Sequence, residues 1–178
     1  TGNWSGTSVT NNGTIDVFSS NGNAYGIDAQ STNNNVNIYG TGDVSVTSWG
    51  GTSFGIDADA ANGNININLD DGHFGIAAYS GLNATAIDAN AASGYVTINS
   101  YADLNVYSWG SATGINAFGA DGVDIDQYGY VTVYAASPGA ATGINASSGT
   151  SSVSVHTGTS SEIAEMTRHI VRKAKEYD

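Results

Sequence analysis

The chain has 178 residues and no cysteine, and its formal net charge is −12 at pH 7. These values exclude a disulfide scaffold and a thiolate metal site, and no apolar run approaches the roughly 18 residues that a membrane-spanning helix needs. All four basic residues lie between Arg168 and Lys175, so residues 1–167 contain no lysine or arginine. Because affinity for nucleic acid depends on basic residues that neutralise phosphates, we expect no nucleic-acid partner.

A four-residue phrase recurs through the first 146 positions. Its copies are GIDA, GIDA, AIDA, GINA and GINA, which begin at Gly26, Gly55, Ala86, Gly114 and Gly143. In each copy one polar residue separates an isoleucine from an alanine. This i, i+2 alternation is the period of a β-strand with one buried face. The phrase therefore predicts the same strand in five successive repeats.

Each repeat contains two further apolar pairs of this kind, and turn-forming Gly, Asn, Ser and Asp residues separate the pairs. The pairs that follow the phrase are Val36/Ile38, Ile65/Ile67, Val96/Ile98, Val123/Ile125 and Val153/Val155. The pairs of the third kind are Ile15/Val17, Val44/Val46, Phe74/Ile76, Leu104/Val106 and Val131/Val133. Helical periodicity is absent before residue 160.

Three short strands per repeat predict an all-β fold, in which residues 1–159 form a parallel β-helix, or β-solenoid, of about five coils. Each coil pairs with the next through parallel strands, and the isoleucines of the phrase form one buried stack. We expect the glycine before the isoleucine to relieve crowding or to supply an unusual backbone angle. An antiparallel sandwich is the alternative, although it gives no reason for every third strand to look alike.

The residue after each isoleucine points outward in this arrangement. These residues form one exterior column of Asp28, Asp57, Asp88, Asn116 and Asn145. Stacked asparagines can form a hydrogen-bonded ladder, whereas stacked carboxylates repel each other. We therefore expect the three aspartates either to be solvated or to be bridged by a cation such as calcium.

Exposed aromatic residues form the candidate ligand site. Trp49 and Trp109 both lie in an SWG segment, three residues beyond the last core residue of a strand. Tyr79 takes the same place in the intervening repeat if Phe74 and Ile76 are the core pair there. The three rings then form an aromatic column that binds a glycan or a protein, since such rings supply contact area at low entropic cost. The alternative is a structural stack that seals the corner.

The densest acidic cluster is DGVDID, at Asp121–Asp126. Asp124 and Asp126 lie on the outward face of a predicted strand, and Asp121 precedes them in a turn. Oxygen ligands at close range are typical of calcium sites, so these three aspartates are the candidate metal ligands. The alternative is a solvated acidic patch, and no other cofactor is expected. The histidines, interpreted as isolated surface residues, are His73, His156 and His169.

Residues 160–178 differ in composition and predict an amphipathic α-helix. Its apolar stripe consists of Ile163, Met166, Ile170, Ala174 and Tyr177. Ser161 is the candidate N-cap. We expect this helix to cap the last coil, whose strand edges would otherwise recruit another chain, or to mediate self-association, or to be a segment fused from elsewhere.

The segments AYGIDA, SFGIDADA and ATGINA, each followed by a strand such as NVNIYG or YVTINS, resemble passenger repeats of bacterial autotransporter adhesins and of filamentous-haemagglutinin-type secreted proteins. The resemblance covers about residues 6–158. It implies a right-handed parallel β-helix at, or released from, a bacterial cell surface, with a role in adhesion, aggregation or biofilm. Because the chain begins with Thr1, we expect it to be a segment of a longer protein.

These observations predict a non-enzymatic extracellular segment, a rigid stalk whose exterior binds a host or bacterial glycan or protein. A self-assembling solenoid that associates through its ends is the alternative. The segment LDDGHFG (Leu69–Gly75) offers the paired carboxylates of a carbohydrate-active β-helix enzyme, but no basic residue is available for an anionic sugar. An ice-binding solenoid needs regular rows of threonine, which one outward column does not supply: Asn37, Asn66, Thr97, Asp124 and Ser154.

Overall fold

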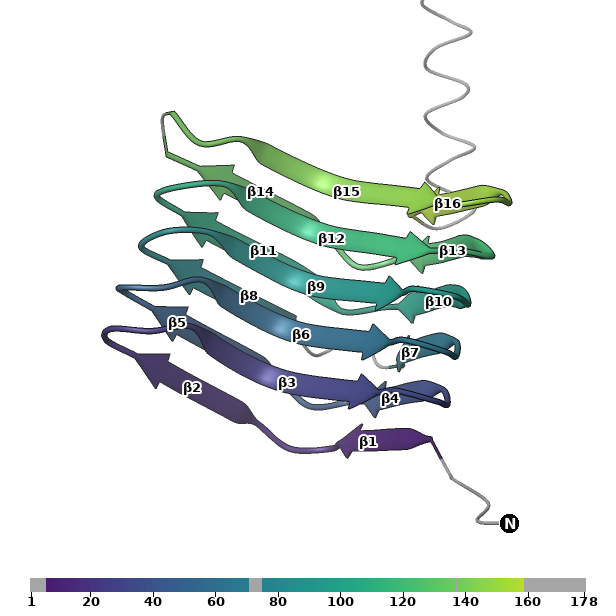
Figure 1. Cartoon of the computed structure of the whole chain (residues 1–178). Coiled ribbons are helices and arrows are strands. Elements are labelled where there is room, and N and C mark those ends of the chain that lie inside the picture. Colours follow the sequence, from purple (N-terminus) through teal and green to yellow (C-terminus); the bar gives the residue numbers. More distant parts are fainter. Residues whose placement is uncertain (1–5, 71–74, 137, 159–178) are drawn as a thin grey trace, which may run out of the picture.

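The computed structural model describes residues 6–70, 75–136 and 138–158. This part of the chain contains sixteen β-strands and no helix. The coils of the chain stack on one another as a β-solenoid, and their strands form three parallel sheets along its sides (Figure 1). The prediction of an all-β solenoid, with about five coils and three strands per coil, is confirmed.

Sheet A has six strands, and sheets B and C have five each. Sheet A contains β1 (Thr7–Asn11), β4 (Val36–Gly40), β7 (Ile65–Leu69), β10 (Tyr95–Ser100), β13 (Gly122–Gln127) and β16 (Val153–Thr157). Sheet B contains β2 (Ile15–Ser19), β5 (Val44–Ser48), β8 (Gly75–Ser80), β11 (Asp103–Ser108) and β14 (Val131–Ala135). Sheet C contains β3 (Ala24–Ser31), β6 (Ser53–Ala60), β9 (Ala84–Ala91), β12 (Ala112–Gly119) and β15 (Ala141–Ser148).

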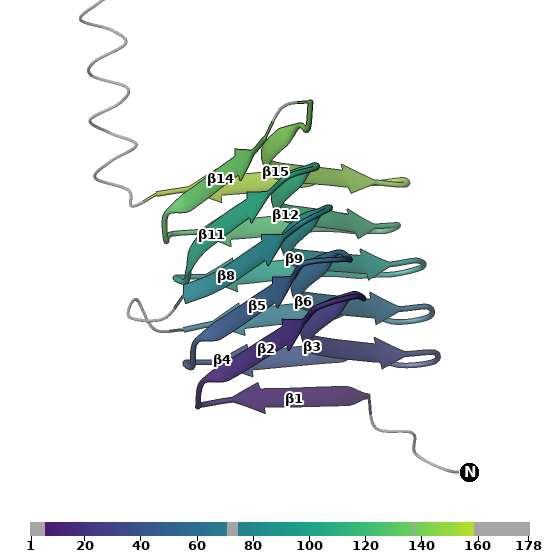
Figure 2. The same ribbon diagram turned by 90° about the vertical axis from the view of Figure 1, so that its left-hand side faces the viewer.

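Each coil passes through sheets B, C and A in turn. The strands β2, β3 and β4 form the first complete coil, β14, β15 and β16 form the fifth, and β1 precedes them. Each strand from β1 to β13 pairs with the strand three places later, so all pairings join neighbouring coils. Figure 2 shows this stacking in sheet B, where the strands from β2 to β14 follow one another along the stack.

Similar side chains from successive coils fill the interior. In sheet C one register position is occupied by Ile27, Ile56, Ile87, Ile115 and Ile144. The three middle isoleucines are completely buried, and the valine–isoleucine pairs of sheet A also keep their predicted register. Burial of such a side chain contributes about 1.5–3 kcal/mol. Because the neighbouring coils supply the cover, the core exists only through stacking.

In the three middle coils the first residue of the phrase and the isoleucine that follows it are both buried. In β6 both Gly55 and Ile56 are buried. A Cβ atom on Gly55 would overlap a methyl group of Ile76 and the carbonyl oxygen of Ala86. Gly55 does not have a positive φ angle, so the prediction of relieved crowding is confirmed and that of an unusual backbone angle is wrong. Only the smallest residues fit at this position.

The predicted core pair of the third coil, Phe74/Ile76, is wrong. In β8, Ile76 pairs with Val44 of the preceding coil and Ala78 pairs with Val46, so the pair is Ile76/Ala78. Both side chains are completely buried. Val44 and Ile76 are 32 positions apart, three more than the 29 that separate the first two copies of the phrase. The longer connection between β7 and β8 therefore shifts the strand relative to the prediction.

The last described coil ends with β16 at Thr157. The amphipathic helix predicted for residues 160–178, and its role as a cap, lie outside the described residues. Over residues 6–70, 75–136 and 138–158 there is no helix of the length and hydropathy that crossing a lipid bilayer requires.

Candidate functional site

A groove of about 280 Å³ lies at one corner of the solenoid, where strands of sheet B end. It extends over three successive coils, those of β5, β8 and β11. Its lining residues are Thr47, Ser48, Trp49, Tyr79, Ser80, Gly81, Tyr107 and Trp109. The structure thus brings the three predicted ligand-binding residues, Trp49, Tyr79 and Trp109, to one site.

The two tryptophans flank this groove from alternate coils, and both are exposed (68% for Trp49 and 63% for Trp109). The residue between them in the column is Gly81, whose backbone N–H donates to the carbonyl oxygen of Ser48, the residue before Trp49, at 2.8 Å. The predicted column is therefore wrong in its middle member, which is Gly81 and not Tyr79. Adjacent coils lie about 4.8 Å apart, so a strip of bare backbone separates two rings whose attachment points are about 10 Å apart.

Tyr79 belongs to the neighbouring column, two residues earlier in the chain. It pairs with Thr47 in the preceding coil and with Tyr107 in the next, and Tyr107 pairs with Tyr134. The rings of Tyr107 and Tyr134 are stacked, with centroids 5.0 Å apart and planes 8° apart. The groove consequently has tryptophans on the side of the turns and tyrosines on the side of the strands.

Buried serines fix the backbone beneath the groove. The hydroxyl of Ser80 donates to the carbonyl oxygen of Gly51 at 2.6 Å, and the hydroxyl of Ser48 donates to that of Gly22 at 2.7 Å. The protons of these hydroxyls are thus already used in hydrogen bonds to the turn of the preceding coil. The other polar groups among the lining side chains are the hydroxyls of Thr47 and the two tyrosines and the indole N–H groups of the tryptophans.

A row of carboxylates follows the outer face of sheet C. Asp28, Asp57 and Asp88 share one register position, as predicted, and Asp59 lies on the same face of β6. Burial raises the pKa of Asp57 to about 6, with additional contributions from the charges of Asp59, Asp88 and Asp28. Burial also raises the pKa of Asp88, against the opposing effect of a hydrogen bond from Asn116 Nδ2. The aspartate half of the column is therefore under mutual repulsion.

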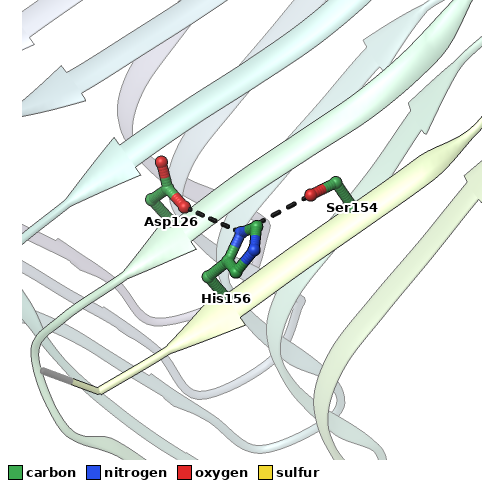
Figure 3. Close-up of polar contacts among 3 residues, drawn as sticks. All are labelled: Asp126, Ser154 and His156. Atoms are coloured by element: carbon green, nitrogen blue, oxygen red, sulfur yellow. Dashed lines mark hydrogen bonds and ion pairs between the residues drawn. The ribbon is translucent and has the colours of Figure 1, made fainter. Parts of the chain in front are cut away.

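A second group of titratable side chains lies on the outer face of sheet A. Asp124 and Asp126 project from β13 and His156 projects from β16, and one ligand atom from each lies within 4.8 Å of the other two. His156 Nδ1 is 3.1 Å from Asp126 Oδ1 and 3.5 Å from Ser154 Oγ (Figure 3). Among the described residues this is the one group of three such side chains whose ligand atoms lie close enough together to hold a metal ion jointly.

This group shares Asp124 and Asp126 with the predicted calcium ligands, but it contains His156 in place of Asp121. Asp121 does not belong to it, because Asp121 precedes β13 and its backbone N–H donates to the carbonyl oxygen of Gly94. His156 does belong to it, although the sequence-based interpretation treated this residue as isolated. A signal was available, because the predicted alignment of Val155 with Ile125 already places the next residues, His156 and Asp126, side by side.

Comparison with protein-family models, with curated proteins and with solved structures finds no match to this chain in any of the three.

Proposed function

We propose that the chain is an extracellular segment of a bacterial surface or secreted protein, a rigid right-handed solenoid that binds a neutral glycan at its aromatic groove. The observation that carries this proposal is the placement of Gly81 between Trp49 and Trp109. Gly81 lines the groove between the two exposed indoles with its backbone alone, because a Cβ atom there would collide with the carbonyl oxygen of Trp49. The rings of Tyr79 and Tyr107 border the same groove. Four aromatic side chains thus converge on one ligand-sized space.

The chemistry of the groove matches the two kinds of surface on a sugar ring. A pyranose has flat C–H faces, which pack on aromatic rings, and hydroxyls around its edge, which form hydrogen bonds. The indole and phenol rings supply the apolar faces, and their N–H and O–H groups, with the hydroxyl of Thr47, supply the polar contacts. A volume of about 280 Å³ lies just below the range of about 300–1,000 Å³ for sites that hold drug-sized ligands, so it suits a short saccharide unit.

The charge of the protein favours a neutral ligand. None of the eight lining residues is charged. Residues 1–167 contain no lysine or arginine that could neutralise a carboxylate or sulfate group. An anionic glycan would therefore find no counter-charge in the groove and would be repelled by the acidic body.

Placement outside the cell rests on the sequence. The GIDA-type repeats resemble bacterial passenger repeats, which also share the scarcity of lysine, arginine and cysteine. The proposed role as a rigid stalk is supported by the strand pairing, because every coil is hydrogen-bonded to the next in all three sheets. The groove then adds recognition to a structure that is otherwise repetitive.

The test is binding of the purified chain to an array of glycans and host matrix proteins, followed by calorimetry with the best neutral oligosaccharide. We expect Trp49→Ala/Trp109→Ala to weaken this binding at least tenfold, a loss of about 1.4 kcal/mol, because it removes both indole faces. Phe18→Ala is the matched control. Phe18 is 67% exposed, pairs with Thr47 from one coil earlier, and does not line the groove.

Two results would contradict the proposal. Unchanged affinity in the double tryptophan variant would place the binding elsewhere on the molecule. Absence of binding by a chain that melts cooperatively would reduce the segment to a stalk without a receptor site.

A further inference from the structure

We propose that Asp124, Asp126 and His156 form a binding site for Zn²⁺, or for a similar divalent cation of the first transition series, on the outer face of sheet A. This site is separate from the aromatic groove, which lies at the end of sheet B, and it is independent of the proposed glycan binding. The proposal combines the geometry of the three side chains with an unsatisfied oxygen in the coil below.

Strand pairing brings these ligands together. Asp124 and Asp126 are two positions apart on β13, so both side chains emerge on the same face. His156 pairs with Asp126 in the next coil. The candidate ligand atoms already lie within 4.8 Å of one another, whereas tetrahedral bonds of about 2.0–2.2 Å to zinc place ligand atoms about 3.3–3.6 Å apart. Small rotations of exposed side chains close this difference, since 63% of the His156 side chain and 37% of the Asp126 side chain are accessible.

The unsatisfied oxygen is Oδ1 of Asn99, which pairs with Asp126 from the preceding coil. This atom is buried and accepts no hydrogen bond from any described residue. The other half of its amide, Nδ2, donates to Asn68 Oδ1 in the coil below, at 3.4 Å. The neighbour of Asn99 in the coil above is Asp126, whose ionised carboxylate has no donor to offer this oxygen.

A comparison with sheet C shows what is missing at this point. There Asn116 Nδ2 likewise donates to the coil below, but Asn116 Oδ1 accepts from Asn145 in the coil above, at 2.8 Å. In sheet A the equivalent neighbour is an aspartate, which when ionised can only accept. A buried acceptor without a donor is costly, and a cation bound by Asp126 removes that cost by offering positive charge to both oxygens.

The donor set identifies the class of ion. Two carboxylates and one imidazole nitrogen are typical ligands of zinc and its neighbours in the transition series. Calcium prefers six to eight oxygen ligands and would gain little from an imidazole. No lysine or arginine occurs in residues 1–167 to compete for the carboxylates. Three protein ligands leave the remaining coordination positions to water or to Asn99 Oδ1.

Isothermal titration of the full chain with ZnCl₂, and separately with CaCl₂, tests this proposal. We expect a saturable zinc site and at least tenfold weaker binding of calcium. His156→Ala and Asp124→Asn should each weaken zinc binding at least tenfold, since each removes one of three ligands. Ser8→Ala, on the outer face of β1 in the same sheet, and His73→Ala, elsewhere in the chain, are controls that should leave the affinity within twofold. Thermal melts of each variant without metal establish that it is folded.

The proposal is overturned if His156→Ala binds zinc as tightly as the parent chain, or if His73→Ala weakens binding equally, which would indicate adventitious surface binding only. Calcium affinity equal to zinc affinity would also overturn it, because it would remove the role of the imidazole.

Discussion

The outer column of sheet C has two halves that share one backbone and differ in their side chains. In the upper coils Asn145 Nδ2 donates to Asn116 Oδ1 at 2.8 Å, and Asn116 Nδ2 donates to Asp88 Oδ1 at 2.9 Å. In the lower coils the same register holds Asp28, Asp57 and Asp88. Carboxylates supply no donor to one another when ionised, and burial together with their mutual charge raises the pKa of Asp57 to about 6.

Behind both halves the interior is the same. Ile56 lies behind the aspartates and Ile115 lies behind the asparagines, and both are completely buried. The fold therefore tolerates repulsion on its surface because the stack of apolar side chains determines the register. The difference between the halves teaches that the interior sets the architecture, whereas the exterior column adjusts stability and its dependence on pH.

The largest effect should come from the interior and should be equal in the two halves. We expect Ile56→Ala and Ile115→Ala each to lower the free energy of unfolding by about 2–5 kcal/mol, because each leaves a cavity between coils. Urea denaturation measures both, and Thr113→Ala on the outward-facing side of β12 is the surface control, expected within about 0.5 kcal/mol of the parent chain. If only one isoleucine variant lost stability, the two halves would not share an equivalent core.

An intermediate effect should follow from extending the aspartate half upward. Asn116→Asp removes the donor to Asp88 and adds a like charge, so we expect a loss of about 1–2 kcal/mol at pH 7. The same variant compared at pH 3, where the carboxylates are largely protonated, is the control and should lose much less. A loss of equal size at both pH values would show that packing, and not charge, distinguishes the halves.

The smallest effect should come from replacing one aspartate of the lower half, Asp57, by asparagine. Because the pKa of Asp57 is raised to about 6 in the folded chain from its ordinary value of 3.8, its ionisation opposes folding. The contribution of Asp57 is thus most favourable below pH 4 and is lost as the pH rises towards and through 6. Asp57→Asn should then gain stability on the order of 1 kcal/mol at pH 7, allowing for solvent screening of a half-buried group, and little at pH 4.

Melting temperatures of parent and variant from pH 4 to pH 7 measure this difference, with Asp16→Asn on the outer face of sheet B as the matched control. If the two curves ran parallel, the charge of Asp57 would have no part in stability.

The alternation in sheets A and C was sufficient to predict the architecture. The isoleucine of the phrase and the valine–isoleucine pairs recur at nearly constant spacing, and each pair has a polar residue at its centre, so no competing register was available. The exterior column from Asp28 to Asn145 followed from the same alignment and is confirmed.

Sheet B was predicted less well because an insertion coincides with an ambiguous sequence. Phe74, Ile76 and Ala78 alternate equally well, and nothing in that alternation decides which two residues form the core pair. Preference for the larger side chains moved the pair by two positions and put Tyr79 in place of Gly81 between the tryptophans. A shift of two residues keeps every side chain on its correct face, so the pattern of burial alone did not reveal the error.

The metal-binding group was only partly predictable, for a different reason. Asp124 and Asp126 are neighbours in sequence, whereas His156 reaches them from the next coil. A search for ligand spacing along the chain does not detect this relation, although a search across aligned repeats would. In a solenoid, residues about 29 positions apart are the true neighbours.

The direction of the hydrogen bonds has a mechanical consequence. Bonds between strands run from coil to coil in all three sheets, so they lie along the axis of the stack. A force that pulls the two ends apart loads these bonds directly, and coils are expected to detach one after another from an end. A released coil of about 29 residues lengthens from about 4.8 Å to roughly 100 Å when extended. A solenoid of this kind would therefore extend under a sudden force by unfolding one coil at a time.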